Sequence, residues 1–348
     1  MAANGKRAVN LALQGGGAHG AFTWGVLDRL LADTRIRIEA ISGTSAGAMN
    51  AVALAEGVTI GGPEAARACL RRFWKGVSTA AKGSPIRRTP IDRFMGNWNL
   101  DTSPAYLFFD LLGRIASPYE VNPLNINPLR DLLEELVDFE RVRACERMKI
   151  FVSATNVETG RVKVFHRHEL TADMVMASAC LPFVFQAVEI DGVPYWDGGY
   201  MGNPALFPLF DGTSSEDVVV VQINPITRGG APKSAREILN RVNEITFNSS
   251  LLREFRAIDF VSRLLDEGKL SPDHYKHVLV HRIAAEAEIN PLGASSKMNA
   301  EWAFLEHLFD IGWRAADIWL EENFRHLGKR STLDIRAMYQ GRDPREEP

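Results

Sequence analysis

The stretch that decides the fold is Ile41-Ser42-Gly43-Thr44-Ser45-Ala46-Gly47-Ala48. Polar and apolar residues alternate before it, over 36–41, and predict a short strand, whereas the Ala-rich residues 46–55 predict a helix. A Gly-x-Ser-x-Gly pattern between a strand and a helix is typical of a nucleophile elbow, a turn so sharp that only small residues fit beside the serine. The pattern is also common by chance, so an ordinary glycine turn with Ser45 as the helix N-cap is the alternative.

A second glycine-rich loop lies upstream, in Gln14-Gly15-Gly16-Gly17-Ala18-His19-Gly20. It follows a predicted strand over 7–13 and precedes a predicted helix over 21–31. Two successive strand–loop–helix units are typical of a parallel α/β sheet. We therefore expect an α/β fold, a three-layer and mostly parallel sheet with helices on both faces and a helical C-terminal extension.

The glycine loop is compatible with two functions. Gly15-x-Gly17-x-x-Gly20, with Glu39 about twenty residues on, matches a dinucleotide-binding fingerprint and so indicates an oxidoreductase. However, Glu39 lies inside the predicted second strand, and the tip of that strand carries Ser45 instead. Because neighbouring parallel strands end at the same edge, the N–H groups of Gly15–Ala18 are expected beside the Ser45 hydroxyl, as an oxyanion hole.

A serine nucleophile needs a base to accept its proton. His274, His277 and His281 follow Ser45 in the chain, but the last two belong to a strand-like segment with polar faces and are expected to be solvated surface residues. Asp197 follows a predicted strand and precedes Gly198 and Gly199. A partly desolvated carboxylate there can act on Ser45 directly, and an ordinary turn aspartate is the alternative.

Composition limits the function classes. The 348 residues are 46% hydrophobic and 24% charged with a net charge of -3, enough for a large core and without the basic excess of a nucleic-acid partner. Cys69, Cys145 and Cys180 lie far apart, which favours reduced thiols. The sequence shows no secretory leader and no apolar run long enough to span a bilayer. We therefore expect a cytoplasmic protein, and any contact with a membrane or lipid body has to be peripheral.

The rest of the chain supplies the remaining elements. Apolar residues at Tyr106–Leu112 favour core packing, with a lid or an acyl-chain wall as the alternative. Asp191-Gly192 between two apolar runs predicts a hairpin. The expected organisation is an acyl hydrolase domain over 9–212 that includes a helical insertion or lid candidate over 63–140, then the last strands and C-terminal helices over 213–335, and a flexible tail over 336–348.

Four blocks of this sequence together resemble the patatin-like phospholipase family of bacterial type. They are Gly15-Gly16-Gly17-Ala18-His19-Gly20, Gly43-Thr44-Ser45-Ala46-Gly47, Ala177-Ser178-Ala179-Cys180-Leu181-Pro182 and Asp197-Gly198-Gly199, in the family's order. The resemblance implies a Ser–Asp dyad of Ser45 and Asp197, with Gly15, Gly16 and Gly17 as the oxyanion loop. His19 stands where many relatives have Arg, so phosphate-bearing head groups are expected to be held less firmly.

We predict a serine acyl hydrolase that cleaves lipid carboxylic esters through an acyl-enzyme and requires no metal and no cofactor. The expected partner is a lipid or acyl-ester substrate. Two alternatives are a dinucleotide-binding oxidoreductase that uses Gly15–Gly20 and a non-catalytic lipid-binding scaffold. No catalytic motif is recognisable after about residue 215.

Overall fold

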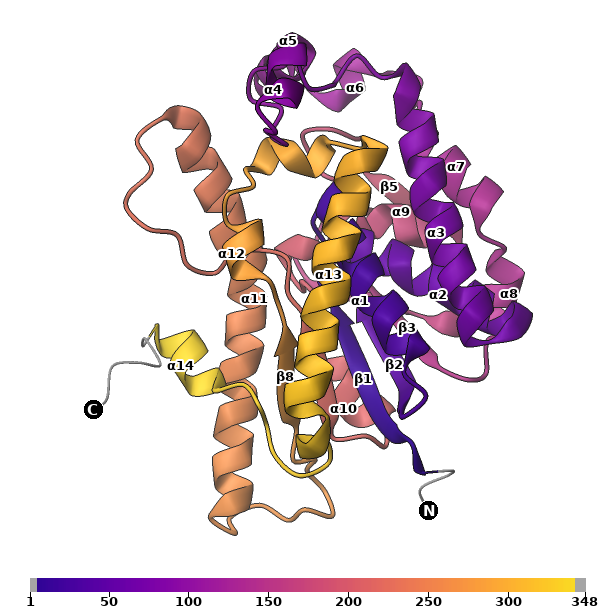
Figure 1. Cartoon of the computed structure of the whole chain (residues 1–348), viewed down its shortest axis with the longest axis vertical. Coiled ribbons are helices and arrows are strands. Elements are labelled where there is room, and N and C mark those ends of the chain that lie inside the picture. Colours follow the sequence, from indigo (N-terminus) through magenta and orange to yellow (C-terminus); the bar gives the residue numbers. More distant parts are fainter. Residues whose placement is uncertain (1–4, 342–348) are drawn as a thin grey trace.

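The computed structural model describes residues 5–341, which form an eight-stranded sheet flanked by helices (Figure 1). Seven strands follow the order β5-β6-β3-β2-β1-β7-β8, and β4 pairs with β3. The strands are β1 (Arg7–Leu13), β2 (Ile36–Gly43), β3 (Lys149–Asn156), β4 (Val162–His166), β5 (Val188–Ile190), β6 (Val193–Asp197), β7 (Asp217–Val221) and β8 (Leu279–Ile283).

The sheet is parallel where the two glycine motifs lie. Strands β3, β2, β1, β7 and β8 run parallel to one another. On the β3 side, β4 and β6 pair antiparallel with β3, and β5 pairs antiparallel with β6. The Asp191-Gly192 turn joins β5 to β6 with φ of 53° and 77°, as a tight hairpin requires. The loops after β1 and β2 therefore meet at one edge, as the sequence predicts.

Helices cover both faces of the sheet. Leu11 and Leu13 of β1 point into a large core with α1, α2, α3 and α13, while Ala12 points into a second core with α10 and α11. The expected three-layer α/β class is thus confirmed. The helices are α1 (Gly20–Ala32), α2 (Ala46–Gly61), α3 (Pro63–Ala80), α4 (Pro90–Phe94), α5 (Pro104–Ile115), α6 (Pro118–Val121), α7 (Pro128–Leu136), α8 (Phe139–Ala144), α9 (Ala172–Ser178), α10 (Phe207–Gly212), α11 (Ala235–Asp266), α12 (Glu286–Ile289), α13 (Trp302–Asn323) and α14 (Ile335–Gln340).

The C-terminal part belongs to the same body as the N-terminal part. Strands β7 and β8 extend the central sheet, and α13 packs along α1. Gly25 and Gly312 lie where these two helices meet, and a Cβ on either would collide with the backbone carbonyl of Phe309 or Phe22. This close approach buries the α1–α13 contact without a gap.

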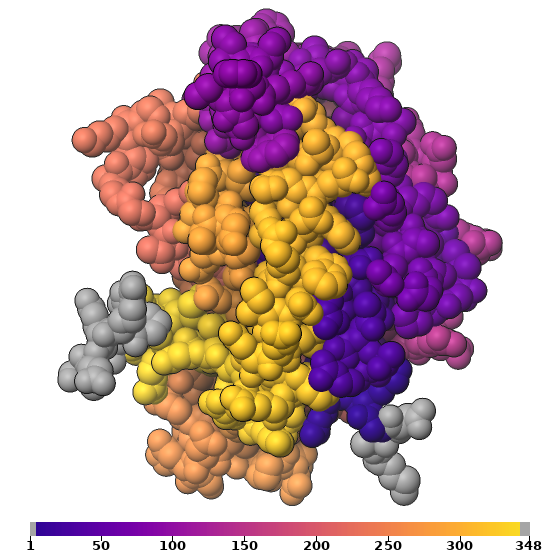
Figure 2. Space-filling model, viewed as in Figure 1, coloured from indigo at the N-terminus to yellow at the C-terminus, as the bar shows by residue number. Residues whose placement is uncertain are grey.

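Residues 84–126, which we call the cap, contain α4, α5 and α6 and lie at the top of the molecule in Figures 1 and 2. C-terminal residues hold the cap in place: Arg88 pairs with Glu301 at 2.8 Å, and the Leu100 N–H donates to Ser295 Oγ at 3.0 Å. In Figure 2 the purple cap rests on these gold residues. The cap is therefore a docked layer rather than a free loop.

The expectation that Tyr106–Leu112 packs in the core is wrong. Helix α5 has no buried residue, and Phe108 is 60% exposed. The segment is amphipathic, and its apolar face is exposed to solvent instead of packing against the core. The flexible tail expected over 336–348 also differs from the structure. Its first residues belong to α14, which packs on α11, and residues 342–348 lie outside the described residues.

In the part of the chain that the structure describes, none of the helices combines the length and the apolar character needed to cross a bilayer.

Candidate active site

The serine turn adopts a conformation that few residues tolerate. Ser45, between β2 and α2, has φ 54° and ψ -120°, a strained combination for a residue with a Cβ. A Cβ on Gly47 would collide with the carbonyl of Leu13, and one on Gly43 would lie 2.7 Å from the backbone of Gly47. The glycines on both sides of Ser45 are thus required by space.

Tertiary hydrogen bonds hold this turn. The Thr44 hydroxyl donates to the carbonyl of Gly202 at 2.7 Å, and the Ser45 N–H donates to Ser178 Oγ at 2.8 Å. Ser178 comes from the Ala-Ser-x-x-x-Pro block, so that block reaches the nucleophile directly. Structure elsewhere in the chain thus compensates for the strain at Ser45.

Asp197 ends β6 and is 3% exposed. The Gly199 N–H donates to its Oδ1 at 2.7 Å, and Gly198 lies so close to the carbonyl of Ser153 that no side chain fits. Burial raises the pKa of Asp197 to about 7, although the Gly199 N–H, the Ser45 hydroxyl and the charge of Lys297 all lower it. The structure therefore brings Asp197 next to Ser45 as a carboxylate that changes protonation near neutral pH.

Half of the amides in the glycine loop are already used. The Gly15 N–H donates to Asn203 Oδ1 at 2.7 Å, and the His19 N–H donates to the carbonyl of Gly16 at 3.2 Å. The Gly20 N–H donates to carbonyls within the 3₁₀ turn over Gly17–His19. These three amides cannot also bind a substrate oxyanion.

The remaining amides of the loop are available. Over residues 5–341, no hydrogen bond to a protein acceptor uses the N–H of Gly16, Gly17 or Ala18. Gly15 instead provides space, because a Cβ there would lie 2.7 Å from Cβ of Ser45. The candidate oxyanion donors predicted over Gly15–Ala18 thus narrow to Gly16, Gly17 and Ala18.

His19 has a structural position. It is 2% exposed, and its Nε2 lies 2.7 Å from Ser296 Oγ, which donates to the carbonyl of Gly293 and therefore accepts the imidazole N–H. Burial, together with the charges of Lys297 and Arg228, lowers the pKa of His19 well below its usual value. The ring is thus enclosed by the fold, and the expected weaker hold on phosphate-bearing head groups stays a prediction.

Two residues that the sequence analysis missed complete this site. Asn224 Nδ2 donates to the carbonyl of Gly15 at 2.7 Å, and Lys297 Nζ donates to Asn224 Oδ1 at 2.7 Å. The absence of a recognisable motif after residue 215 therefore does not mean the absence of site residues. Asn224 follows β7, the strand that pairs with β1, and the run of valines at 218–221 is the one sequence signal that could have identified this position.

The candidate histidine bases lie elsewhere. His281 is fully buried, contrary to the expectation of a surface residue, and its Nε2 lies 2.9 Å from Asp217 Oδ1. Asp217 begins β7, whereas Ser45 follows the end of the parallel β2, so the pair lies near the opposite edge of the sheet. His277 is paired with Asp266 at 3.3 Å. No histidine in the described residues hydrogen-bonds to Ser45 or Asp197.

The acid of the dinucleotide fingerprint has another role. The Glu39 carboxylate accepts the N–H groups of Ser214 and Ser215, at 2.6 and 3.2 Å. These bonds tie β2 to the loop before β7, at the start of the strands and away from the glycine loop. Glu39 is therefore not placed to bind a ribose.

An apolar pocket of about 700 Å³ lies between the cap and the end of β6. Its lining includes Thr155, Trp196 and Tyr200, together with the strongly exposed Ile115 and Phe183. The Thr155 hydroxyl donates to the backbone carbonyl of Asp197 at 2.8 Å, which connects the pocket wall to the candidate base. The pocket has the size and character of a site for an apolar chain.

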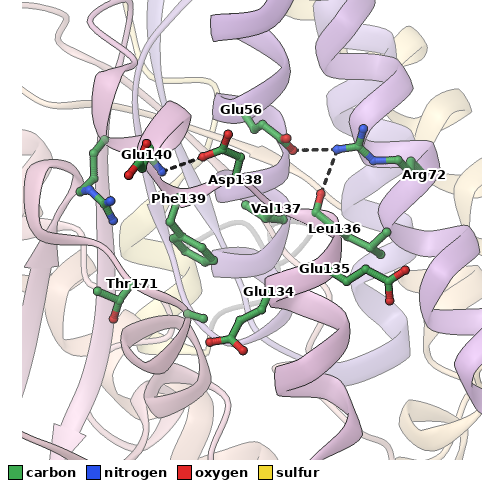
Figure 3. A pocket seen from close by; sticks show the side chains of 12 residues that line it. Glu56, Arg72, Glu134, Glu135, Leu136, Val137, Asp138, Phe139, Glu140 and Thr171 are labelled. Carbon is green, nitrogen blue, oxygen red and sulfur yellow. Dashed lines mark hydrogen bonds and ion pairs between the residues drawn. The ribbon is translucent and has the colours of Figure 1, made fainter.

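A second pocket, of about 650 Å³, is polar and remote from this site (Figure 3). Arg72 donates to the Glu56 carboxylate at 2.9 Å and to the carbonyl of Leu136, on one side of the pocket. Glu56 lies eleven residues along α2 from Ser45, roughly 16 Å at the helical rise. Neither pocket is lined by Ser45 or Asp197, but the apolar pocket is lined by Trp196, the chain neighbour of Asp197, whereas no residue that lines the polar pocket is next to either of them in the chain.

Comparisons with known proteins agree with the motifs. The family model described as Patatin-like phospholipase matches residues 11–210, more than half of the chain. The chain belongs to the patatin-like phospholipase family, which places it among lipid hydrolases. No curated protein matches it.

Solved structures similar to this chain include VipD from Legionella pneumophila, with a TM-score of 0.44 and 16% identity over 90% of this chain and 67% of that chain. A chain of the heterodimeric ExoU–SpcU complex from the type III secretion system of Pseudomonas aeruginosa is similar with a TM-score of 0.38 and 15% identity. That match covers 92% of this chain and 52% of the other, so this chain spans about half the length of that protein.

Proposed function

We propose that this protein is a serine acyl hydrolase that cleaves carboxylic esters of lipids with a Ser45–Asp197 dyad. One observation supports this most strongly: a buried carboxylate whose pKa is raised to about 7 lies beside a serine in a strained turn. A base with a pKa near neutrality combines a large deprotonated fraction with a useful affinity for the serine proton.

The reaction has two stages. Asp197 accepts the Ser45 proton as Oγ attacks the ester carbonyl, and collapse of the tetrahedral intermediate expels the alcohol, which takes that proton. Water then attacks the acyl-enzyme, Asp197 accepts a proton from it, and Ser45 leaves as the restored hydroxyl. The free N–H groups of Gly16, Gly17 and Ala18 are the proposed donors to the oxyanion; losing one such donor typically costs about 3 kcal/mol.

The apolar pocket is the proposed site of the acyl chain. Its lining includes Thr155, which donates to the carbonyl of Asp197, and Trp196, the chain neighbour of Asp197, together with the exposed Ile115 and Phe183. Phe183 is 71% exposed, so the pocket mouth itself is apolar. An acyl chain that enters there passes from one apolar environment to another, without a water-filled step.

The cap is the proposed contact with the lipid surface. Among its exposed apolar side chains, six are more than 60% exposed: Ile91, Phe94, Met95, Ile115, Leu124 and Ile126. Ile115 belongs to both the pocket and this face, so the face borders the pocket. Burying one such side chain in lipid contributes about 1.5–3 kcal/mol, and several together suffice for peripheral binding.

The experiment that tests the dyad is labelling with a fluorophosphonate, followed by mass-spectrometric mapping and an assay of fatty-acid release from phospholipids, glycerides and short-chain esters. We expect one labelled residue, Ser45, and no label and no ester cleavage with Ser45→Ala. A Ser45→Ala protein that cleaves esters at the wild-type rate would refute the proposal. Vesicle binding without any fatty-acid release by the wild-type protein would favour a lipid-binding scaffold instead.

A further inference from the structure

Lys297 has an unusual electrostatic position for a lysine. It is half-buried, and within residues 5–341 no carboxylate oxygen lies within 4.0 Å of its ammonium group. Its hydrogen-bond partner is the neutral Asn224 Oδ1, at 2.7 Å. A desolvated ammonium is stable only with compensation, so an anionic partner from outside the chain would satisfy it.

The carboxylates around Lys297 are already occupied. Glu244 is buried and pairs with Arg228 at 2.7 Å and with Arg241 at 3.1 Å. Asp197 accepts the Gly199 N–H and lies beside Ser45. Burial lowers the pKa of Lys297, the charges of Glu244 and Asp197 raise it, and that of Arg228 lowers it. This side of the site therefore has more positive than negative charge.

Lys297 is also fixed against the glycine loop. Its backbone carbonyl lies 2.5 Å from the position that a Cβ on Gly17 would take. Its ammonium is bound to Asn224 Oδ1, which lies 3.8 Å from the corresponding position on Gly16. Gly16 and Gly17 are two of the three proposed oxyanion donors, so Lys297 is held next to the part of the loop where we propose that the ester carbonyl binds.

In a glycerophospholipid, the phosphate is only a few covalent bonds from the ester oxygen of the glycerol. We propose that Lys297 binds this phosphate, and that the protein therefore prefers phospholipids to neutral glycerides. The assignment rests on the proposed acyl hydrolase function and adds the substrate class. A charge-assisted hydrogen bond from an ammonium to a phosphate oxygen replaces the missing carboxylate partner.

The first test compares two substrates with the same acyl chains, phosphatidylglycerol and diacylglycerol, in the same mixed detergent micelles. The proteins are the wild type, Lys297→Met, Lys297→Arg and the matched control Lys269→Met, whose lysine is exposed and paired with Glu267. We expect Lys297→Met to lower the ratio of kcat/KM values, phospholipid over glyceride, about tenfold or more, since bonds to charged groups have that weight. Lys297→Arg should keep most of the ratio, and Lys269→Met all of it.

The second test uses ligands without an ester. Dodecyl phosphate should protect Ser45 from fluorophosphonate labelling, and Lys297→Met should raise its half-protecting concentration about tenfold while leaving that of dodecanol unchanged. Inorganic phosphate should protect far less, because it lacks the chain that fills the apolar pocket; equal protection would mean a site for free phosphate and would overturn the substrate assignment.

The outcomes separate the two proposals. An unchanged substrate ratio in a Lys297→Met protein that still labels at Ser45 would refute the phosphate site and leave the acyl hydrolase intact. An equal loss on both substrates would also refute it, because Lys297 would then act on the dyad. Absence of labelling and of fatty-acid release in the wild type would refute both.

Discussion

Two aspartates with almost no exposed surface behave in opposite ways. Asp92 in the cap is 4% exposed and Asp197 at the sheet edge is 3% exposed. The pKa of Asp92 is lowered to about 2, first by the Thr102 hydroxyl and then by Thr89 and Asn97, whereas burial raises that of Asp197 to about 7. Exposed area alone therefore does not determine the charge of a carboxylate.

Depth and the number of donors explain the difference. Asp92 is covered by its own neighbours in a thin surface layer, where Thr89, Asn97 and Thr102 all donate to it. Asp197 is the last residue of β6, which pairs with β3 inside the fold, and it accepts one backbone N–H. A carboxylate saturated with donors holds structure together, and one left short of donors keeps affinity for a proton. Asp92 thus anchors the cap, whereas Asp197 has the properties expected of the base that we propose.

The largest expected effect is on catalysis. Asp197→Asn is nearly isosteric but cannot accept a proton, so we expect kcat for p-nitrophenyl butyrate to fall about 10³–10⁴-fold with an unchanged circular dichroism spectrum. Asp92→Asn should stay within about twofold of the wild type on this soluble ester, because Asp92 touches only the cap. Near-normal turnover by Asp197→Asn would contradict the proposed difference between the two aspartates and would indicate a different base.

The second effect is on the pH dependence of stability. The pKa of Asp197 in the folded state, about 7, lies above its unfolded value near 4, so the folded state binds more protons between these pH values. The contribution of Asp197 to the free energy of unfolding is therefore fully present below pH 4. It is lost as the pH rises through 7, a decrease on the order of 4 kcal/mol. Asp92 has the opposite sign: its contribution is present above pH 4 and lost as pH falls toward 2.

Urea unfolding at pH 4 to 8 measures this directly. Asp197→Asn should be more stable than the wild type at pH 8 and lose the advantage toward pH 4.

The kcat/KM of the wild type should rise with pH up to about 7 and then level, as expected for a base that must be deprotonated. Parallel stability curves for the wild type and Asp197→Asn would contradict the raised pKa.

A smaller effect concerns the lipid face of the cap. The double variant Phe94→Asp/Leu124→Asp places two charges on side chains that are exposed in the free protein, so the fold should persist. We expect hydrolysis of phospholipid vesicles to fall about tenfold, with little change on p-nitrophenyl butyrate, because two apolar contacts with lipid are lost. Ile318→Asp, on the exposed side of α13, is the control and should change neither rate.

The smallest effect is at the cap anchor. Asp92→Ala removes the acceptor of Thr102 and one half of the capping box with Thr89. We expect a loss of about 1–2 kcal/mol in local stability, seen as faster amide exchange over residues 89–103, and weaker activity on vesicles than on the soluble ester. Equal losses on both substrates would show that the cap also positions the dyad.

The sequence by itself determined the class of fold and the order of the catalytic motifs. Ser45 with Gly43 and Gly47, and Asp197 with Gly198 and Gly199, could be predicted because each turn brings backbones so close that only glycine fits, and such local steric demands are visible in a few adjacent letters. The predicted strands over 7–13 and 36–41 also match β1 and β2, since hydrophobic alternation is a local property.

Only the tertiary structure decided which groups carry charge at the site and which surface remains apolar. The pKa of Asp197, the enclosure of His19 by Ser296 and the position of Lys297 all depend on residues far away in the chain, and the exposure of α5 depends on how the whole chain packs. Burial and donor number are sums over the whole fold, whereas periodicity and motif spacing describe neighbours in the chain. For that reason the proposed nucleophile could be predicted from sequence, and the residue proposed to select its substrate could not.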